Sequence, residues 1–406
     1  MNGSGTTRSG ATSAPANPAG DRPADPAVTA QGQGAATPAA DGHRGVHSES
    51  GALPGEHPGR SRNPVIKVAG LAWLEFEKPD LDAAERFLAD FGFVVLDRTP
   101  QALVMRARWA GPACLVIRRG SRSRFAGPAF VAAGREDLVR LARAAGGTVV
   151  PYHGGNAVAL TDPSGFDVRV VHGVPDHPAL PERQPLPLNF GGQRQRVNAT
   201  QRPARRPADV QRLGHVALGT TRFRAALDWY LDHLGLIVSD FLYQDGRAGR
   251  APVMAFIRCD RGSEPTDHHT LAMALMPETG LLHSAYQLTD LDEVAASGEY
   301  LRERGYRHAW GIGRHIQGSQ IFDYWRDQDR LMFEHYADGD LFDCTLEPGW
   351  APMSVSGLAQ WGPRATREFT GAGDPATVLA AIKALRDKGN EVDFAAIRGL
   401  VKAMSS

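Results

Sequence analysis

The sequence lacks three features: an excess of charge of one sign, a long apolar run and a cysteine pattern. Its 45 Lys and Arg residues balance 45 Asp and Glu residues over 406 positions, which argues against binding to nucleic acid or to an anionic membrane surface. No run approaches the about 20 apolar residues that a bilayer-spanning helix needs. The three cysteines are too scattered for a disulfide framework or a Cys-x-x-Cys metal clip. We therefore expect a cytoplasmic protein without nucleic-acid or membrane partners.

Composition divides the chain into five segments. Residues 1–62 contain almost no large apolar side chains, so we expect a disordered tail that cannot bury enough surface to offset the entropy of ordering. A stretch rich in Pro, Arg and Gln at 179–210 is typical of a linker between two globular blocks, at 63–178 and 211–345. The extension at 346–406 ends in two helical patterns, and we interpret it as a helical packing or oligomerisation appendage.

The two globular blocks repeat each other. Each opens with a strand pattern followed by an amphipathic helix, predicted at 81–91 in the first block and at 223–234 in the second. Each helix stops just before a glycine, Gly92 or Gly235, which suits the left-handed backbone conformation that closes helices. Each block then has a central strand, a second helix, an acidic turn and a final strand. This order predicts an α+β fold with two tandem β-α-β-β-β modules in each of two similar domains.

Three side chains that can bind metal distinguish the second block from the first. They are His215, His283 and Glu334. The first block has non-ligands at the positions that we align with them, namely Leu71, Phe130 and Arg169. A single histidine is more often a hydrogen-bonded strand residue than a ligand, but a carboxylate among apolar neighbours needs a compensating charge. Together, two imidazoles and one carboxylate leave coordination positions open, as in non-haem Fe(II) oxygenases.

The candidate ligands lie in three short motifs: Leu213-Gly214-His215-Val216, Leu282-His283-Ser284-Ala285-Tyr286 and Phe333-Glu334. As an ordered set, these motifs resemble the type I extradiol dioxygenases, the catechol-cleaving branch of the vicinal oxygen chelate superfamily. The resemblance covers about residues 65–345. It implies a vicinal oxygen chelate fold that binds metal only in its second domain. It also implies cleavage of a catechol-type aromatic diol by O2 and Fe(II) in aromatic compound catabolism, with Mn(II) as an alternative metal and a homo-oligomeric assembly.

The resemblance also implies three pocket residues that are not metal ligands. Tyr324 and His315 precede Glu334 at spacings similar to those of the family, and they would hydrogen-bond the substrate oxygens. The family's pocket histidine stands two residues before a threonine, so His268 would face the bound oxygen and donate a proton. His269 would then point to the opposite strand face, because side chains alternate along a strand, and we interpret it as structural. A one-residue slip of the strand would exchange the two histidines.

One motif departs from the family pattern, and three other functions compete. The final turn reads Asp327-Gln328-Asp329-Arg330, where the family has Asp-Pro-x-Gly, the form kept at Asp162 to Gly165. Another enzyme of the same superfamily, such as a glyoxalase or an epimerase, is one alternative. A 2-oxo-acid-dependent dioxygenase with the same three ligands is a second, and a non-catalytic protein that binds an aromatic ligand is a third. The absence of ligands at Leu71, Phe130 and Arg169 disfavours the first alternative, and the pocket set of His268, His315 and Tyr324 favours extradiol cleavage over the other two.

Overall fold

Two curled β-sheets with the same internal strand order carry the fold in the computed structural model, which describes residues 48–244, 250–353, 358–371 and 375–405. The first sheet has the order β3-β4-β5-β2-β6-β9-β8-β7, and the second contains the matching order β11-β12-β14-β10-β15-β18-β17-β16. Each half therefore consists of two β-α-β-β-β modules that join along one central strand pair. The predicted α+β architecture with tandem modules is confirmed.

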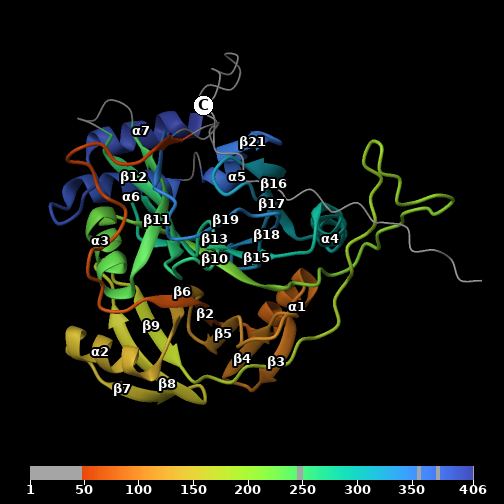
Figure 1. Cartoon of the computed structure of the whole chain (residues 1–406), viewed down its shortest axis with the longest axis horizontal. Coiled ribbons are helices and arrows are strands. Elements are labelled where there is room, and N and C mark those ends of the chain that lie inside the picture. Colours follow the sequence, from red (N-terminus) through yellow and green to blue (C-terminus); the bar gives the residue numbers. More distant parts are fainter. Residues whose placement is uncertain (1–47, 245–249, 354–357, 372–374, 406) are drawn as a thin grey trace, which may run out of the picture. The chain divides into compact units, whose positions relative to one another are not determined.

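Each half of the protein runs through its modules in the same order of elements (Figure 1). The first half comprises β2 (Val68–Lys78), α1 (Leu81–Phe91), β3 (Val94–Arg98), β4 (Ala102–Arg106), β5 (Leu115–Arg119), β6 (Arg124–Ala132), α2 (Arg135–Ala145), β7 (Val149–Tyr152), β8 (Gly155–Thr161) and β9 (Asp167–His172). The second half comprises β10 (Arg212–Thr220), α3 (Phe223–Leu234), β11 (Leu236–Tyr243), β12 (Pro252–Cys259), β14 (Leu271–Leu275), β15 (Gly280–Gln287), α4 (Leu291–Glu303), β16 (Arg307–His315), β17 (Ile321–Arg326) and β18 (Met332–Ala337).

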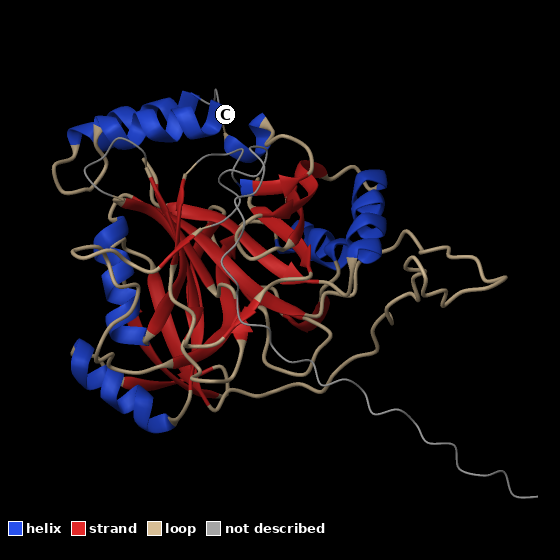
Figure 2. Ribbon diagram, turned by 45° about the horizontal axis from the view of Figure 1, so that its top comes forward, coloured by secondary structure: helices blue, strands red, loops and turns tan. Residues whose placement is uncertain are grey.

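Further strands extend the second sheet beyond the repeated unit, and helices lie on the outer sides of the strands (Figure 2). β20 pairs with β11 and carries β1 on its other side, β21 pairs with β16, and β13 and β19 form a separate two-stranded sheet. These elements and the C-terminal helices are β1 (Glu49–Ser50), β13 (Thr266–Asp267), β19 (Leu341–Phe342), β20 (Gly349–Pro352), β21 (Ala359–Trp361), α5 (Arg367–Thr370), α6 (Pro375–Arg386) and α7 (Phe394–Ser405).

The helices that open the two halves begin and end where the sequence predicts. α1 starts after Asp80, whose side chain accepts hydrogen bonds from two backbone N–H groups of the first turn. It ends at Gly92, and α3 ends at Gly235, both with positive φ (124° and 64°). At Gly235 both the positive φ and the lack of space disfavour a side chain, because a Cβ there would lie 2.4 Å from the carbonyl oxygen of Ile66.

The acidic turn before the last strand has the same conformation in both halves despite its altered sequence. Asp162 Oδ1 accepts hydrogen bonds from the backbone N–H groups two and four residues further on, and Asp327 Oδ1 does the same in the second half. Gly165 has a φ of 92°, and Arg330 takes the matching left-handed conformation with a φ of 69°. The side-chain hydrogen bonds of the aspartate therefore hold the turn even where arginine replaces glycine.

The structure differs from the predicted tail at residues 48–62 but agrees with an irregular connection at residues 179–210. Residues 1–47 of the predicted tail lie outside the described residues. The prediction of disorder is wrong for residues 48–62, because β1 pairs with β20 and the backbone of Gly59 accepts a hydrogen bond from Val238. Residues 179–210 contain no helix or named strand, as expected for a linker. Within the described residues no helix is long and apolar enough to cross a membrane.

The two halves share one hydrophobic core, so they are not independent domains in packing terms. The ring of Phe91 on α1 lies 5.7 Å from that of Phe333 on β18. Lys78 at the end of β2 is buried and donates a hydrogen bond of 2.5 Å to Asp327 in the second half. The backbone carbonyl of Phe91 accepts a hydrogen bond of 2.8 Å from Nε2 of the buried His335. The first half thus supports the strand that carries Glu334.

Candidate metal centre

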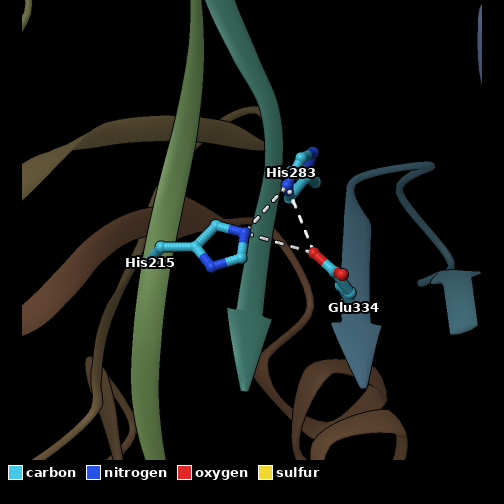
Figure 3. Close-up of side chains that lie close together, drawn as sticks. All are labelled: His215, His283 and Glu334. Carbon is cyan, nitrogen blue, oxygen red and sulfur yellow. Dashed lines mark hydrogen bonds and ion pairs between the residues drawn. The ribbon is translucent and has the colours of Figure 1, made fainter. Parts of the chain in front are cut away.

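Three neighbouring strands bring the predicted metal ligands together (Figure 3). His215 lies on β10, His283 on β15 and Glu334 on β18, and these strands are consecutive in the sheet. His215 Nε2 lies 3.2 Å from His283 Nε2 and 3.2 Å from Glu334 Oε2, while His283 Nε2 lies 3.3 Å from the same oxygen. Within the described part of the chain this is the one group of three such residues close enough to share a metal ion.

Burial makes these side chains suitable as metal ligands. It also makes the charged form of the carboxylate energetically unfavourable unless a cation is bound. Burial lowers the pKa of His215 and of His283 to about 3, so both imidazoles are neutral and keep a lone pair for a metal. Burial raises the pKa of Glu334, which is fully enclosed, and neither of its oxygens has a hydrogen-bond partner among the described residues. A divalent cation would compensate this buried carboxylate.

His315 and Tyr324 lie beside the ligands, as the sequence predicts. His315 Nδ1 donates a hydrogen bond of 2.7 Å to the carbonyl oxygen of Leu358, which leaves Nε2 as an acceptor. The Tyr324 hydroxyl lies 2.8 Å from that Nε2 and donates its proton there. His315 Nε2 also lies 3.8 Å from Glu334 Oε1, so His315 and Tyr324 both stand beside the carboxylate. Burial raises the pKa of Tyr324 well above its ordinary value.

The structure exchanges the predicted places of the two adjacent histidines. His269 lines the pocket that contains the metal ligands, and its ring centroid lies 3.9 Å from that of His215. His268 stands behind it, with Nδ1 2.9 Å from His269 Nδ1. The prediction that His268 faces the pocket is wrong, because residues 268–270 are irregular and β14 begins only at Leu271. Strand alternation therefore does not apply to this segment.

Apolar side chains complete the pocket, and two of them come from the C-terminal extension. The lining residues beyond the ligands and their polar neighbours are Met254, Phe256, Ala272, Gln317, Gln320, Leu358 and Phe369. Leu358 and Phe369 belong to the segment that we interpreted as a packing or oligomerisation appendage. In this part of the extension the packing is against the pocket itself. The sequence gives no signal for these contacts, because the extension has no counterpart in the repeat.

Strand register corrects the alignment of the two halves. Ala285 pairs with both His215 and Glu334, and the matching Ala129 pairs with Trp73 and Arg169. By the same register, His283 corresponds to Gly127. The residues that replace the ligands in the first half are therefore Trp73, Gly127 and Arg169, not Leu71 and Phe130 as aligned from sequence. The alignment slipped because β-bulges interrupt both central strand pairs.

An internal ion-pair cluster occupies the matching place in the first half. Glu75 is 2 % exposed and accepts hydrogen bonds from Trp73 Nε1 at 3.1 Å and the Tyr152 hydroxyl at 2.8 Å. Arg118 and Arg169 contact its second oxygen at 3.3 and 3.6 Å. Side chains of the protein itself neutralise this buried carboxylate, so the first half has no need of a metal ion there.

Comparison with known proteins gives concordant matches. Residues 212–335 match the family model of the Glyoxalase/Bleomycin resistance protein/Dioxygenase superfamily. Over 340 residues the chain is 33 % identical to Metapyrocatechase 2 of Cupriavidus necator, a match that covers 81 % of this chain and 98 % of the relative. An iron-dependent extradiol dioxygenase of Rhodococcus jostii (strain RHA1) is 23 % identical over 324 residues. This match covers 73 % of this chain and 97 % of that relative. The Mn(II)-bound glyoxalase from Novosphingobium aromaticivorans superposes with a TM-score of 0.61 at 22 % identity, over 74 % of this chain and 94 % of that one.

Proposed function

Because the chain belongs to the extradiol dioxygenases of the glyoxalase/bleomycin resistance protein/dioxygenase superfamily, we propose that it opens the ring of a catechol-type aromatic diol with O2 and non-haem Fe(II). As a member of this family it is an oxidoreductase that incorporates both oxygen atoms. The observation that carries the proposal is the convergence of His215, His283 and Glu334 in a pocket that also contains His269, His315 and Tyr324.

The donor set suits a metal ion with open coordination positions. Two neutral imidazole nitrogens and one buried carboxylate form the 2-His-1-carboxylate set of non-haem iron oxygenases. When bound, the metal provides adjacent positions for the diol and O2, and a path for electrons between them. Iron is the metal that we propose, and Mn(II) is the alternative that the same ligands accept.

The remaining pocket residues orient the substrate and move protons. Tyr324 and His315 hydrogen-bond the diol oxygens and thereby fix the ring relative to the ligand set. His269 exchanges a proton with the reacting oxygen, the role assigned from sequence to His268. The apolar lining, which includes Phe256 and Phe369, suits the face of an aromatic ring and excludes water from the reacting atoms.

Two further expectations accompany this proposal. A homo-oligomer is supported by apolar side chains on the C-terminal helices, where Leu379 is 68 % and Phe394 75 % exposed. A cytoplasmic location suits an enzyme that must keep its iron ferrous. Both remain predictions. A glyoxalase or epimerase activity is disfavoured because Trp73 and Arg169 stand where a second set of ligands would be needed.

Oxygen consumption tests the proposed activity. The protein is loaded anaerobically with Fe(II) or with Mn(II) and offered catechol, 3-methylcatechol and 2,3-dihydroxybiphenyl, while an oxygen electrode and visible absorbance are recorded. We expect stoichiometric O2 uptake and a yellow ring-fission product with at least one diol, and none with metal-free protein. The more active metal identifies the cofactor. Absence of uptake on protein shown to retain iron, or uptake only after addition of a 2-oxo acid, would contradict the proposal.

A further inference from the structure

The irregular segment that carries His268 and His269 is fixed by its backbone. Ser239 Oγ donates a hydrogen bond of 2.5 Å to the carbonyl oxygen of His268, and the His268 N–H donates to the carbonyl oxygen of Asp340 at 2.8 Å. The buried guanidinium of Arg258 donates in turn to Ser239 Oγ at 2.9 Å. The two imidazoles therefore have little freedom to change places.

A chain of side-chain hydrogen bonds runs from the protein interior to the pocket. Asp240 Oδ2 lies 2.7 Å from His268 Nε2, and His268 Nδ1 lies 2.9 Å from His269 Nδ1. A carboxylate can only accept, so a neutral His268 donates from Nε2 and has an unprotonated Nδ1. That nitrogen must accept from His269, which therefore carries its proton on Nδ1. The lone pair of neutral His269 is then on Nε2, the ring nitrogen that does not contact His268.

The carboxylate at the start of this chain is held from two further elements. Ser48, just before β1, donates a hydrogen bond of 2.7 Å to Asp240 Oδ1. Gly349 at the start of β20 packs over the same oxygen, because a Cβ at that position would lie only 2.1 Å from it. Asp240 is thus clamped by two segments that have no counterpart in the repeated modules.

From this geometry we propose that Asp240 and His268 are positioning residues for ring cleavage, which fix the tautomer and the orientation of His269. The inference rests on the proposed function, since His269 matters as a proton acceptor only if a diol is the substrate. A hydrogen-bonded acid of this kind keeps an imidazole in one tautomer, and the wrong tautomer presents a proton where a lone pair is needed. The orientation is set before substrate binds and costs no rearrangement during the reaction.

Three substitutions separate hydrogen-bond direction from packing. Asp240→Asn places an amide N–H opposite His268 Nε2 while Ser48 still donates to the remaining oxygen, so both histidines must change tautomer. His268→Leu removes both hydrogen bonds. His268→Gln keeps a donor for Asp240 and an acceptor for His269. As a matched control, His57→Leu removes another histidine–aspartate pair (His57 Nε2 to Asp228 Oδ1, 2.8 Å) at a residue that does not line the pocket.

Steady-state kinetics on the Fe(II)-loaded variants give the first readout. We expect Asp240→Asn and His268→Leu to lower kcat by about 10²-fold, the lower end of the usual contribution of general acid–base catalysis, with metal content and KM for the diol near those of the wild type. His268→Gln should recover much of this loss, and His57→Leu should leave kcat unchanged. Equal losses in His268→Gln and His268→Leu, or losses no larger than that of the control, would overturn the proposal.

A second readout is independent of turnover and so separates this inference from the proposed function. In Zn(II)-loaded protein with ¹⁵N-labelled histidine, NMR distinguishes the two tautomers of a neutral imidazole. We expect His269 to carry its proton on Nδ1 in the wild type and on Nε2 in Asp240→Asn. A wild-type His269 protonated on Nε2 would refute the hydrogen-bond chain, whatever the protein does with a diol.

Discussion

At the scale of single residues, the metal centre depends on Glu334 more than on any other side chain. Its carboxylate is fully buried among the described residues, so a bound cation is the charge that we expect to balance it. His215 and His283 meet it from the two neighbouring strands at 3.2 and 3.3 Å. Removing any one of these side chains leaves two candidate metal ligands, which would bind a metal ion only weakly.

We therefore predict that His215→Ala, His283→Ala and Glu334→Ala each abolish iron retention. The measurement is metal content after anaerobic loading and gel filtration, with His57→Ala as a control that removes a buried histidine elsewhere. His268→Leu should retain iron and lose rate, because it does not touch the ligand set. Full metal content in all three ligand variants would show that the metal lies at a different site.

Sequence reasoning reached these ligands because each lies in a short motif on a regular strand. It failed at His268 and His269, where the segment is not a strand and a two-residue alternation has no physical basis. It also missed Leu358, because a contact between the extension and the pocket leaves no periodic pattern in the chain. The chemistry of a site is thus more readable from sequence than the contacts that enclose it.

At the scale of elements, the turn between β16 and β17 controls the position of His268. Gly318 in this turn has a φ of 82°, and a Cβ there would lie 3.0 Å from His268 Nδ1, the atom that accepts from His269. The carbonyl oxygen of Gly318 also accepts a hydrogen bond of 2.9 Å from Asp340, which in turn accepts from the His268 backbone. The turn and the histidine segment thus form one packed unit.

We predict that Gly318→Ala lowers both stability and kcat. Gly146→Ala is the matched control, since Gly146 also has a positive φ (65°) but nothing within 4 Å of its Cβ position. Both substitutions should cost on the order of 1–2 kcal/mol in urea unfolding, because a side chain is strained in the left-handed conformation. Only Gly318→Ala should reduce turnover. An equal kcat in the two variants would mean that the turn does not position His268.

The repeated elements were predictable from local chemistry, whereas the added ones were not. Helix caps and glycine stops define α1 and α3 in the sequence, and the acidic turns mark β9 and β18. β1, β20 and β21 are short strands at sheet edges, and their pairing partners lie far away in the chain. Nothing local distinguishes such segments from coil, and residues 48–62, predicted to be disordered because they have few large apolar side chains, are ordered by these distant partners.

At the scale of the whole described molecule, His335 links the halves and makes stability depend on pH. Burial lowers its pKa to about 3, while its Nε2–H donates to the carbonyl oxygen of Phe91 in the first half. Below pH 6.5, His335 binds a proton in the unfolded chain but stays neutral in the folded state. Its contribution to stability is therefore complete above pH 6.5 and is lost as pH falls from there toward 3.

His335→Gln tests this linkage, because glutamine can donate the same hydrogen bond but does not titrate. We expect the wild type to lose about 1 kcal/mol more than the variant between pH 7.5 and 5.5, from the proton uptake of one histidine. Urea unfolding of metal-loaded protein at the two pH values measures the difference. A variant with the same pH dependence as the wild type would show that His335 already accepts a proton in the folded state.

The ion-pair cluster around Glu75 has a consequence for how the protein meets its surroundings. The first half carries its counter-charge in its own sequence, as Arg118 and Arg169. The second half, with Glu334 in the matching sheet, must take its counter-charge from the medium. A shortage of metal, or a chelator, would therefore remove the counter-charge of Glu334 but not that of Glu75. In charge terms, one portion of the molecule is self-sufficient and the other depends on a supplied cation.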